Sequence, residues 1–453
     1  MGRPPGTVPS ADWRAANDVA GDAPGAGPDE GASPDIGGQP GLHVIALIFC
    51  IYLFNQIDRN LVQYVLEPIG REMNLTDGQL GFIAGPALAF CYAIFGVPIA
   101  IFADSRNRVH IIAAAIVIWS GFALSTAYCT TFTQLVIARF GVGIGEAGFS
   151  AIALSLITDL YKPSRRAAAV GIFSSAIPAS GIVCGALVAF VIGVHGWRTG
   201  FTVAAVPGFI LALLLLKLIR DPRERAVGVA RTGSLKAALS LVWSNRAMRH
   251  LVIGQGLANI VAAGVSTWAA TYFARAYKVT PAETGFWLAT MAGLVCFVSI
   301  WLGTVACRYA ARRGAGWMLF GIIAAVNIFA VPLIALMLFC GDKLIALFLY
   351  LAVNACLFFF IPTTNYIGQQ LAPAGMRATI AALIVMIQVL VGATFGIQLV
   401  GVLSDGLNPL TGNDTDSLRI AMMILSICSL WSAAHYFLAM RATRTSKDNA
   451  ADA

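Results

Sequence analysis

Long apolar stretches dominate the chain, and short polar segments separate them. Each stretch reaches the roughly 20 residues that a helix needs to cross the hydrocarbon core of a bilayer. The pattern repeats about twelve times and predicts an all-α membrane protein with twelve transmembrane helices. The expected helices cover residues 42–69, 77–103, 108–128, 132–158, 165–194, 198–219, 247–277, 281–306, 315–340, 343–370, 374–403 and 417–440.

The composition agrees with a chain that is largely embedded in a membrane. Of its 453 residues, 58% are hydrophobic and 11% are charged, whereas soluble domains carry about 25% charged residues. The nine cysteines and five histidines stand singly, and no pair of them has the spacing of a metal site or a redox motif. We therefore expect an integral membrane protein that needs no metal and no cofactor.

Polar segments at the two ends and in the middle divide the chain. Residues 1–40 and 442–453 lack apolar periodicity and are predicted to be disordered; we do not expect the first segment to be a signal peptide. Residues 221–246 form a basic linker, in which Ser234 to Trp243 has the spacing of an amphipathic helix on a membrane surface. Six-helix bundles are expected at 41–220 and 247–441. Lysine and arginine favour the loops that share a side with both termini, which predicts cytoplasmic termini.

The two halves contain related segments. "LTDGQLGF" (Leu75–Phe82) precedes the second predicted helix, and "VTPAETGF" (Val279–Phe286) precedes the eighth. Each has the Thr-x-x-Gln/Glu pattern of a capping box, followed by Gly-Phe. Each following helix ends in a basic turn, at Ala103–Arg108 and Cys307–Arg313. Two parallel six-helix repeats joined by a long central loop are the architecture of major facilitator transporters.

Three segments of the first half resemble the Spinster family of that superfamily. They are "ARFGVGIGEAGFSAIALSLITDLYKPSRRAAAVGIFSSAIPASGIVCG" (Ala138–Gly185), "NQIDR" (Asn55–Arg59) and "GWRTGFTVAAVPG" (Gly196–Gly208). The resemblance is good over about residues 45–220 and weak beyond them. It implies a fold and activity like those of eukaryotic members, which move lysophospholipids or sphingosine-1-phosphate, some with suggested proton coupling. Its bacterial members lead us to expect a location in a bacterial inner membrane.

Four charged side chains stand inside predicted helices, where a charge costs a few kcal/mol. Asp58 and Arg59 follow Asn55 on the first helix, and Arg139 and Glu146 share one face of the fourth. A rise of about 1.5 Å per residue places Asp58 and Arg139 nearly level, with Glu146 about 10 Å from Arg139. We expect Asp58 and Arg139 to neutralise each other, and Arg59 is long enough to reach Glu146.

Glu146 is the residue that we expect to carry a proton. A partly desolvated carboxylate without a firm partner can gain and lose a proton at working pH. The predicted proton-coupling set is therefore Asp58, Arg59, Arg139 and Glu146. The alternative is that these four charges form a static brace.

The second half offers neutral polar residues in an apolar and aromatic wall. Asn259, Trp268 and Asn365, together with Asn55 of the first half, are the predicted substrate-binding residues. A charged half that faces an apolar half suits an amphiphile with an ionic head and a long apolar body. The alternative is that these aromatic residues face lipid.

The predicted gate follows the second helix. The superfamily's loop there reads roughly Gly-x-x-x-Asp-Arg-x-x-Arg, and Asp104 and Arg108 match it, whereas Ala100 and Ser105 depart from it. In the second copy, Cys307 replaces the acid. The resemblance therefore implies a cytoplasmic latch that depends on Asp104 and Arg108.

These features predict a secondary active transporter that works by alternating access, is coupled to protons and moves an amphipathic organic solute such as a lysophospholipid or a sphingolipid-like molecule. Its expected partners are this substrate, protons and membrane lipids; we expect a monomer and no nucleic acid. One rival is a proton symporter of small organic anions, such as aromatic or sugar acids, bound by Arg59 or Arg139. Others are a multidrug efflux transporter and a non-transporting receptor. No nucleophile–base pair, phosphate loop or metal cluster favours an enzyme.

Overall fold

The structure, a computed structural model, describes residues 41–104, 106–222, 235–373 and 376–451, and in these it contains helices and no strand. The first bundle comprises α2 (Leu42–Met73), α3 (Asp77–Ala84), α4 (Pro86–Asp104), α5 (Arg108–Thr126), α6 (Phe132–Glu146), α7 (Phe149–Leu160), α8 (Pro163–Ser174), α9 (Ala176–Ala186), η1 (Leu187–Ile192) and α10 (Gly193–Leu218). The second comprises α12 (Arg246–Tyr277), α13 (Pro281–Glu283), η3 (Thr284–Met291), α14 (Ala292–Arg312), α15 (Trp317–Phe339), α16 (Lys343–Leu371), α17 (Arg377–Ile387), η5 (Gln388–Gly396), α18 (Ile397–Thr411), α19 (Asp414–Ser426) and α20 (Cys428–Ala451).

Parts of the predicted linker and of the predicted C-terminal tail are helical. The tail at 1–40 and residues 223–234 of the linker lie outside the described residues. The end of the linker forms α11 (Leu235–Ser244), which packs on α12 and α17. The helix α20 continues past residue 442, where the disordered tail was predicted to begin, to Ala451. Alanine, arginine and lysine in this segment favour the helical state.

Eleven stretches of the described residues are long and apolar enough to cross a membrane. One of them, Ser164–Leu218, is 55 residues long and turns at Gly196, whose φ of 81° and ψ of 168° are not helical. Glycine adopts such a positive φ without a steric penalty. This stretch therefore holds the fifth and the sixth predicted helices, and each of the twelve predicted spans has a helical counterpart.

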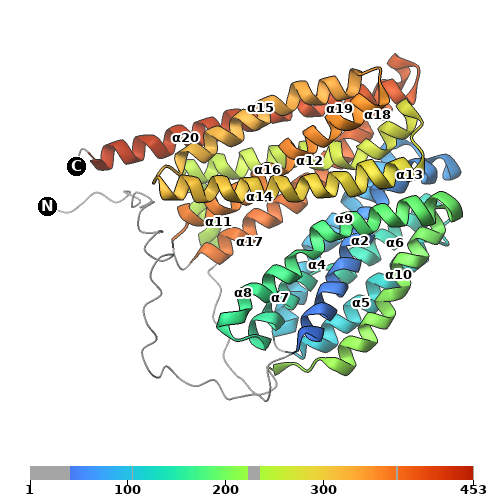
Figure 1. The fold of residues 1–453 in the computed structure, drawn as a ribbon, viewed down its shortest axis with the longest axis horizontal. Helices are drawn as coiled ribbons and strands as arrows, with labels where there is room; N and C mark the ends of the chain where they lie inside the picture. The colour runs from blue at the N-terminus through green and yellow to red at the C-terminus, as the bar shows by residue number, and fades with distance from the viewer. Residues whose placement is uncertain (1–40, 105, 223–234, 374–375, 452–453) are drawn as a thin grey trace.

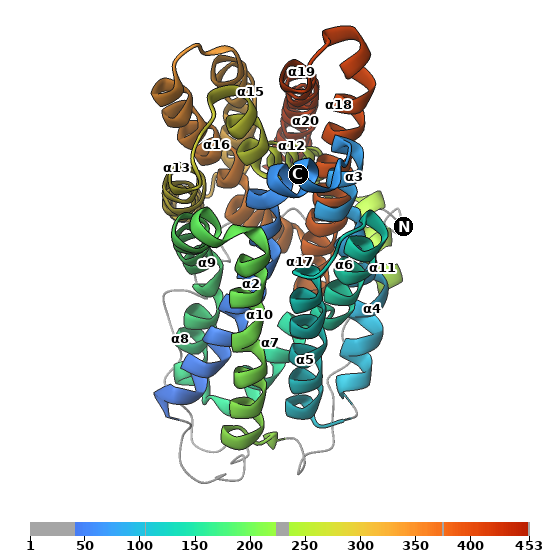
Figure 2. The same cartoon turned by 90° about the vertical axis from the view of Figure 1, so that its right-hand side faces the viewer.

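The two bundles lie at an angle to each other and converge at one end, which carries α13 and α18 (Figure 1) and also α3 (Figure 2). At the other end, which carries α8, α11 and α17, they are spread apart. The view from the convergent side shows the α2–α10 bundle below and the α12–α20 bundle above (Figure 2). Contacts between the bundles join α3 to α18, α9 to η3 and α2 to α12.

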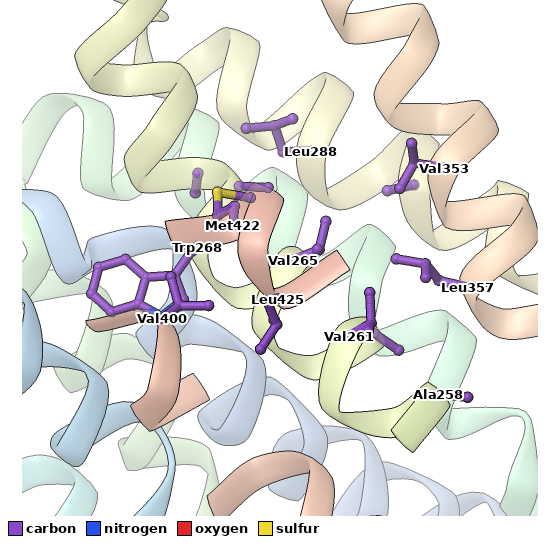
Figure 3. Close-up of a cluster of buried hydrophobic side chains, with 14 of the residues drawn as sticks. Ala258, Val261, Val265, Trp268, Leu288, Val353, Leu357, Val400, Met422 and Leu425 are labelled. Atoms are coloured by element: carbon purple, nitrogen blue, oxygen red, sulfur yellow. The ribbon is translucent and has the colours of Figure 1, made fainter. Parts of the chain in front are cut away.

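The second bundle has an apolar core centred on α12. Ala258, Val261, Val265 and Trp268 follow one another at helical spacing on one side of this helix, and all are buried. Figure 3 shows them surrounded by buried side chains of η3, α16, α18 and α19, namely Leu288, Val353, Leu357, Val400, Met422 and Leu425.

The helices at the boundary between the bundles are irregular. The π-helical turns η1, η3 and η5 lie in three of them, and such turns are common at functional sites. Glycines permit close approach at two crossings. A Cβ atom on Gly285 would lie 2.3 Å from the carbonyl oxygen of Gly185, and one on Gly401 would lie 2.3 Å from the carbonyl oxygen of Asp77. The bundles therefore meet through backbone at these points.

Candidate functional site

Asp58 of α2 and Arg139 of α6 form an ion pair inside the first bundle. The Arg139 Nη1 atom donates a hydrogen bond to Asp58 Oδ2 at 3.3 Å. The two residues are 3% and 1% exposed. Removing water from two charges is costly, and mutual attraction offsets this cost only when the partners stay together. The two residues that were expected to be level are thus in contact.

Arg59 and Glu146 form a second ion pair between the same two helices. The Arg59 Nε atom donates to Glu146 Oε2, and the Arg59 guanidinium lies over the ring of Tyr92, 4.6 Å from its centroid. Glu146 is 1% exposed. Arg59 thus reaches Glu146, as the length of its side chain allows.

The backbone breaks directly after Glu146. It is the last residue of α6; the next two positions leave the helix, with ψ of 126° at Ala147 and φ of 76° at Gly148. The C-terminal end of a helix disfavours a negative charge because its carbonyl groups are unpaired there. The Glu146 carboxylate therefore depends on Arg59 as its counter-charge.

Several polar atoms of this cluster have no partner in the protein. Asn55 Nδ2, Asp58 Oδ1, Arg139 Nε and Glu146 Oε1 are buried and make no hydrogen bond in the described structure. Buried polar atoms are paired in most native proteins, so an unpaired group calls for a specific explanation. Water or the polar groups of a solute could pair with these two donors and two acceptors.

The residues expected to line the substrate site in the second bundle have different surroundings. Asn259 of α12 is half-buried and faces η5, where a Cβ on Gly392 would lie 2.7 Å from its Oδ1 atom. Asn365 of α16 donates from Nδ2 to the Ile361 carbonyl, which leaves its buried Oδ1 unpaired. Trp268 is fully buried, and its indole N–H donates to the Ile397 carbonyl at 2.9 Å. The Trp268 ring is therefore used for packing.

The two residues of the predicted gate are only partly described. Arg108 is 1% exposed and makes hydrogen bonds within the first bundle. Its guanidinium contacts Asp159 at 2.7 Å, Ser155 at 3.0 Å and Asp221. These contacts brace the ends of α5, α7 and α10. The side chain of Asp104 lies outside the described residues.

Sequence reasoning missed a polar cluster that joins the bundles at their convergent end. We call Glu67, Asp77, Arg275, Ser404 and Asp405 the interbundle cluster. Arg275 of α12 donates to Glu67 at 2.7 Å and to Asp77 at 2.7 and 2.9 Å. Ser404 of α18 donates to Asp77 at 2.6 Å. Asp405 accepts from the backbone N–H groups of Asp77 and Gly78, at 2.9 and 2.8 Å.

The interbundle cluster closes the protein at this end. Its Arg275, Glu67 and Asp77 side chains are only 12%, 11% and 7% exposed. Beside it, a polar cavity of about 500 Å³ is lined by residues of both bundles, including Glu67, Arg275, Lys278 and Asp414. The usable signal in the sequence was that Asp77 begins the second predicted helix and Glu67 lies just before the end of the first. Nothing in the sequence pairs Asp77 with Asp405.

Comparisons with known proteins agree with this architecture. The sequence model of the Major Facilitator Superfamily matches residues 48–397. An MFS-type efflux pump of Mycolicibacterium smegmatis is 27% identical over 410 residues, which cover 87% of this chain and 91% of the pump. Protein spinster homolog 1 of Mus musculus is 31% identical over 190 residues, which cover 41% of this chain and 35% of the mouse protein.

A solved structure has the same fold. It is a bacterial homolog of the human lysosomal transporter Spinster, in an inward-facing and unoccupied conformation, with a TM-score of 0.80 and 24% sequence identity. The superposition covers 89% of this chain and 98% of that protein. The matched proteins are transporters rather than enzymes. The chain belongs to the major facilitator superfamily of integral membrane transporters.

Proposed function

We propose that the chain is a proton-coupled secondary transporter that moves an amphipathic organic solute by alternating access. The observation that carries this proposal is the pair of buried ion pairs, Asp58–Arg139 and Arg59–Glu146, with an unpaired oxygen on each carboxylate. A charged cluster at this depth is expensive to maintain. This cost favours a role for the charged cluster in binding and releasing protons or charged groups.

In the proposed cycle, Glu146 is the proton carrier. A proton on Glu146 removes the counter-charge of Arg59 and frees the guanidinium for an anionic group of the solute. Loss of the proton restores the Arg59–Glu146 pair and displaces that group. The Asp58–Arg139 pair beside it keeps the remaining charges balanced during the exchange.

Alternating access requires that the bundles separate at one end while they close at the other. The interbundle cluster would keep the convergent end closed, and the spread end with α8 and α17 would face the compartment that receives or supplies solute (Figure 1). The described chain begins with α2 and finishes with α20 at the spread end (Figure 1), and the basic loops there favour the cytoplasm of a bacterium. We assign the chain to the inner membrane as a monomer of two bundles.

The apolar character of the second bundle favours an amphiphile. The N-terminal bundle supplies charge, whereas the described polar groups of α12 and α16 that are candidates for contact with a solute are the neutral Asn259 and Asn365. An ionic head would bind near Asn55 and Arg59, and an apolar tail would extend along the second bundle. Lysophospholipids and sphingolipid-like molecules have this form.

Multidrug efflux is the second candidate. The match to the mycobacterial efflux pump extends over most of both chains. An efflux pump and a lysolipid transporter share an apolar cavity. They differ in how strictly the head group is recognised.

A homologous series of single-chain phosphate and zwitterionic lipids tests the proposal. Competition binding below micelle formation should show affinity that rises with chain length, by up to about 0.8 kcal/mol for each buried methylene. Affinity that stays flat along the series, together with tight binding of a short aromatic or sugar acid, would favour an organic-anion symporter. Equal binding of anionic, zwitterionic and cationic heads would favour multidrug efflux.

A further inference from the structure

Gln255 of α12 is buried, and neither end of its side chain has a partner. The residue is 1% exposed, and its Oε1 and Nε2 atoms make no hydrogen bond within the described structure. A buried amide without partners has lost its hydrogen bonds to water and has gained none in the protein. Such a group calls for a specific explanation.

Three helices of the second bundle meet one turn away from Gln255. A Cβ atom on Gly368 of α16 would lie 2.3 Å from Ile384 Cδ1 of α17 and 3.6 Å from Leu251 Cδ2 of α12. Leu251 and Gln255 stand at positions i and i+4 and therefore share a face of α12. Gln255 thus lies beside the place where α12, α16 and α17 converge.

Two further contacts give the directions of these helices. A Cβ atom on Gly264 of α12 would lie 2.8 Å from the Gly396 carbonyl oxygen, so residue numbers rise together along α12 and along the helix formed by α17 and η5. The rings of Phe273 on α12 and Tyr350 on α16 have centroids 5.8 Å apart, so α16 runs in the opposite direction. One turn from the triple contact toward the convergent end is therefore about four residues later in α12 and α17 and about three earlier in α16.

Each of the three helices carries an amide side chain on that turn. The residues are Gln255, Gln388 at the start of η5 and Asn365 of α16, and we call them the amide cluster. Gln388 Nε2 and Asn365 Oδ1 are buried and unpaired, as are both ends of Gln255. We propose that the amide cluster binds a neutral, hydroxyl-bearing group of the transported solute, such as a glycerol or a sugar. This inference rests on the proposed transport of an amphipathic solute and adds a polyol to its head group.

The amide cluster has the hydrogen-bonding groups that a polyol requires. Its unpaired atoms are two amide nitrogens, which donate, and two amide oxygens, which accept. A hydroxyl group both donates and accepts, so two neighbouring hydroxyls can pair with all four atoms. A carboxylate would leave the two oxygens unpaired, and a quaternary ammonium would leave all four atoms unpaired.

The helices around the amide cluster favour a neutral group. Residues 250–274 of α12, 344–371 of α16 and 378–404 of α17, η5 and α18 contain no Asp, Glu, Lys or Arg. An ionic group at this depth would therefore find no counter-charge on them. The ionic part of the solute is left to Arg59 in the first bundle, and the amide cluster selects among solutes by their hydroxyl groups.

Two matched pairs of ligands test the site by binding to the purified full chain. The first pair is a lysophospholipid with a phosphoglycerol head and its analogue with a phosphopropyl head and the same acyl chain, both used below micelle formation. The second pair is glycerol phosphate and propyl phosphate. The wild type should bind the hydroxylated member about tenfold or more tightly in the first pair, because the analogue leaves the polar groups of the site unpaired.

Gln255→Leu should reduce this preference to about threefold or less, while binding of the phosphopropyl lipid stays unchanged. Because the amide has no partner in the protein, its replacement by an apolar side chain should not lower the melting temperature. Asn327→Leu on α15 is the control and should keep the preference, since the Asn327 side chain donates to the Ile323 carbonyl of its own helix.

The two pairs separate a failure of this site from a failure of the proposed amphiphile. A preference in the second pair alone would refute the amphiphile and support the polyol site. Equal binding of both members in both pairs would overturn the amide cluster as a solute site, even where affinity rises with acyl chain length. An undiminished preference in folded Gln255→Leu would overturn it as well.

Discussion

The carboxylate of Asp405 in the second bundle caps the helix that begins at Asp77 in the first bundle, by accepting hydrogen bonds from the backbone N–H groups of Asp77 and Gly78. Unpaired N–H groups and the helix dipole make the start of a helix favourable for a negative charge. Here the negative charge comes from the other bundle. The cap is therefore present only while the two bundles are closed at this end.

Weakening the interbundle cluster should open the convergent end. Asp405→Asn removes the charge from the cap, which is worth about 0.3–1 kcal/mol. Arg275→Gln leaves Asp77 without its cation, at a cost of about 3–5 kcal/mol, whereas Glu67 keeps its pair with Arg71. Both changes should move the population toward the state that is open at this end, Arg275→Gln more strongly.

Spin labels at Tyr128 and Leu410 provide the measurement, because both residues are highly exposed and belong to different bundles. Distances between the labels should lengthen in both variants. Asp416→Asn is the matched control, since Asp416 pairs with Arg419 on its own helix. An unchanged distance distribution in Arg275→Gln would show that the cluster does not hold the bundles together.

The Asp58–Arg139 pair should show strong energetic coupling. Asp58→Asn strands Arg139 in a buried environment, which typically costs about 3–5 kcal/mol. Adding Arg139→Gln removes the stranded charge, so the double variant should be more stable than Asp58→Asn alone. Thermal unfolding of the two single variants and the double variant gives the coupling energy, which we expect to be about 0.5–3 kcal/mol. Strictly additive effects would mean that the pair does not form.

The close crossing of α9 and η3 should not tolerate a side chain. Gly285→Ala places a methyl group 2.3 Å from the Gly185 carbonyl oxygen and 2.9 Å from Ala189, and overpacking of this kind costs about 1–3 kcal/mol. Melting temperature and transport rate should both fall. Gly171→Ala on α8 is the control, because a Cβ atom there meets nothing within 4 Å. Equal melting of the two variants would contradict the assigned crossing.

Much of the fold could be predicted because its signals are local. The capping boxes at Thr76 and Thr280 are confirmed, each with its reciprocal hydrogen bonds, because the box depends on residues within one turn. Asp58 and Arg139 could be placed at one level from helical rise alone, since depth in a membrane is a single coordinate.

Other features depend on contacts that no local pattern encodes. Asp405 binds backbone N–H groups 328 and 327 positions away. Nearly every residue has a backbone N–H group, so the sequence does not indicate which of them a distant carboxylate will bind. The apolar pattern of the predicted fourth helix did not indicate the break after Glu146, although Gly148 makes the positive φ possible. Arg108 was assigned from the motif that contains it, whereas its hydrogen-bond partners Asp159 and Asp221 come from the ends of other helices.

Glu146→Gln tests the proposed coupling most directly. The substitution keeps the size of the side chain and a hydrogen-bond acceptor for Arg59, but removes the titration. In proteoliposomes loaded with a pH-sensitive dye, the wild type should show proton flux that depends on solute and solute uptake that depends on the pH gradient. Glu146→Gln should lose both, while binding solute within about tenfold of the wild-type affinity, about 1.4 kcal/mol. Asp416→Asn should behave as the wild type. Undiminished gradient-driven uptake and proton flux in Glu146→Gln would contradict the assignment of Glu146 as the proton carrier.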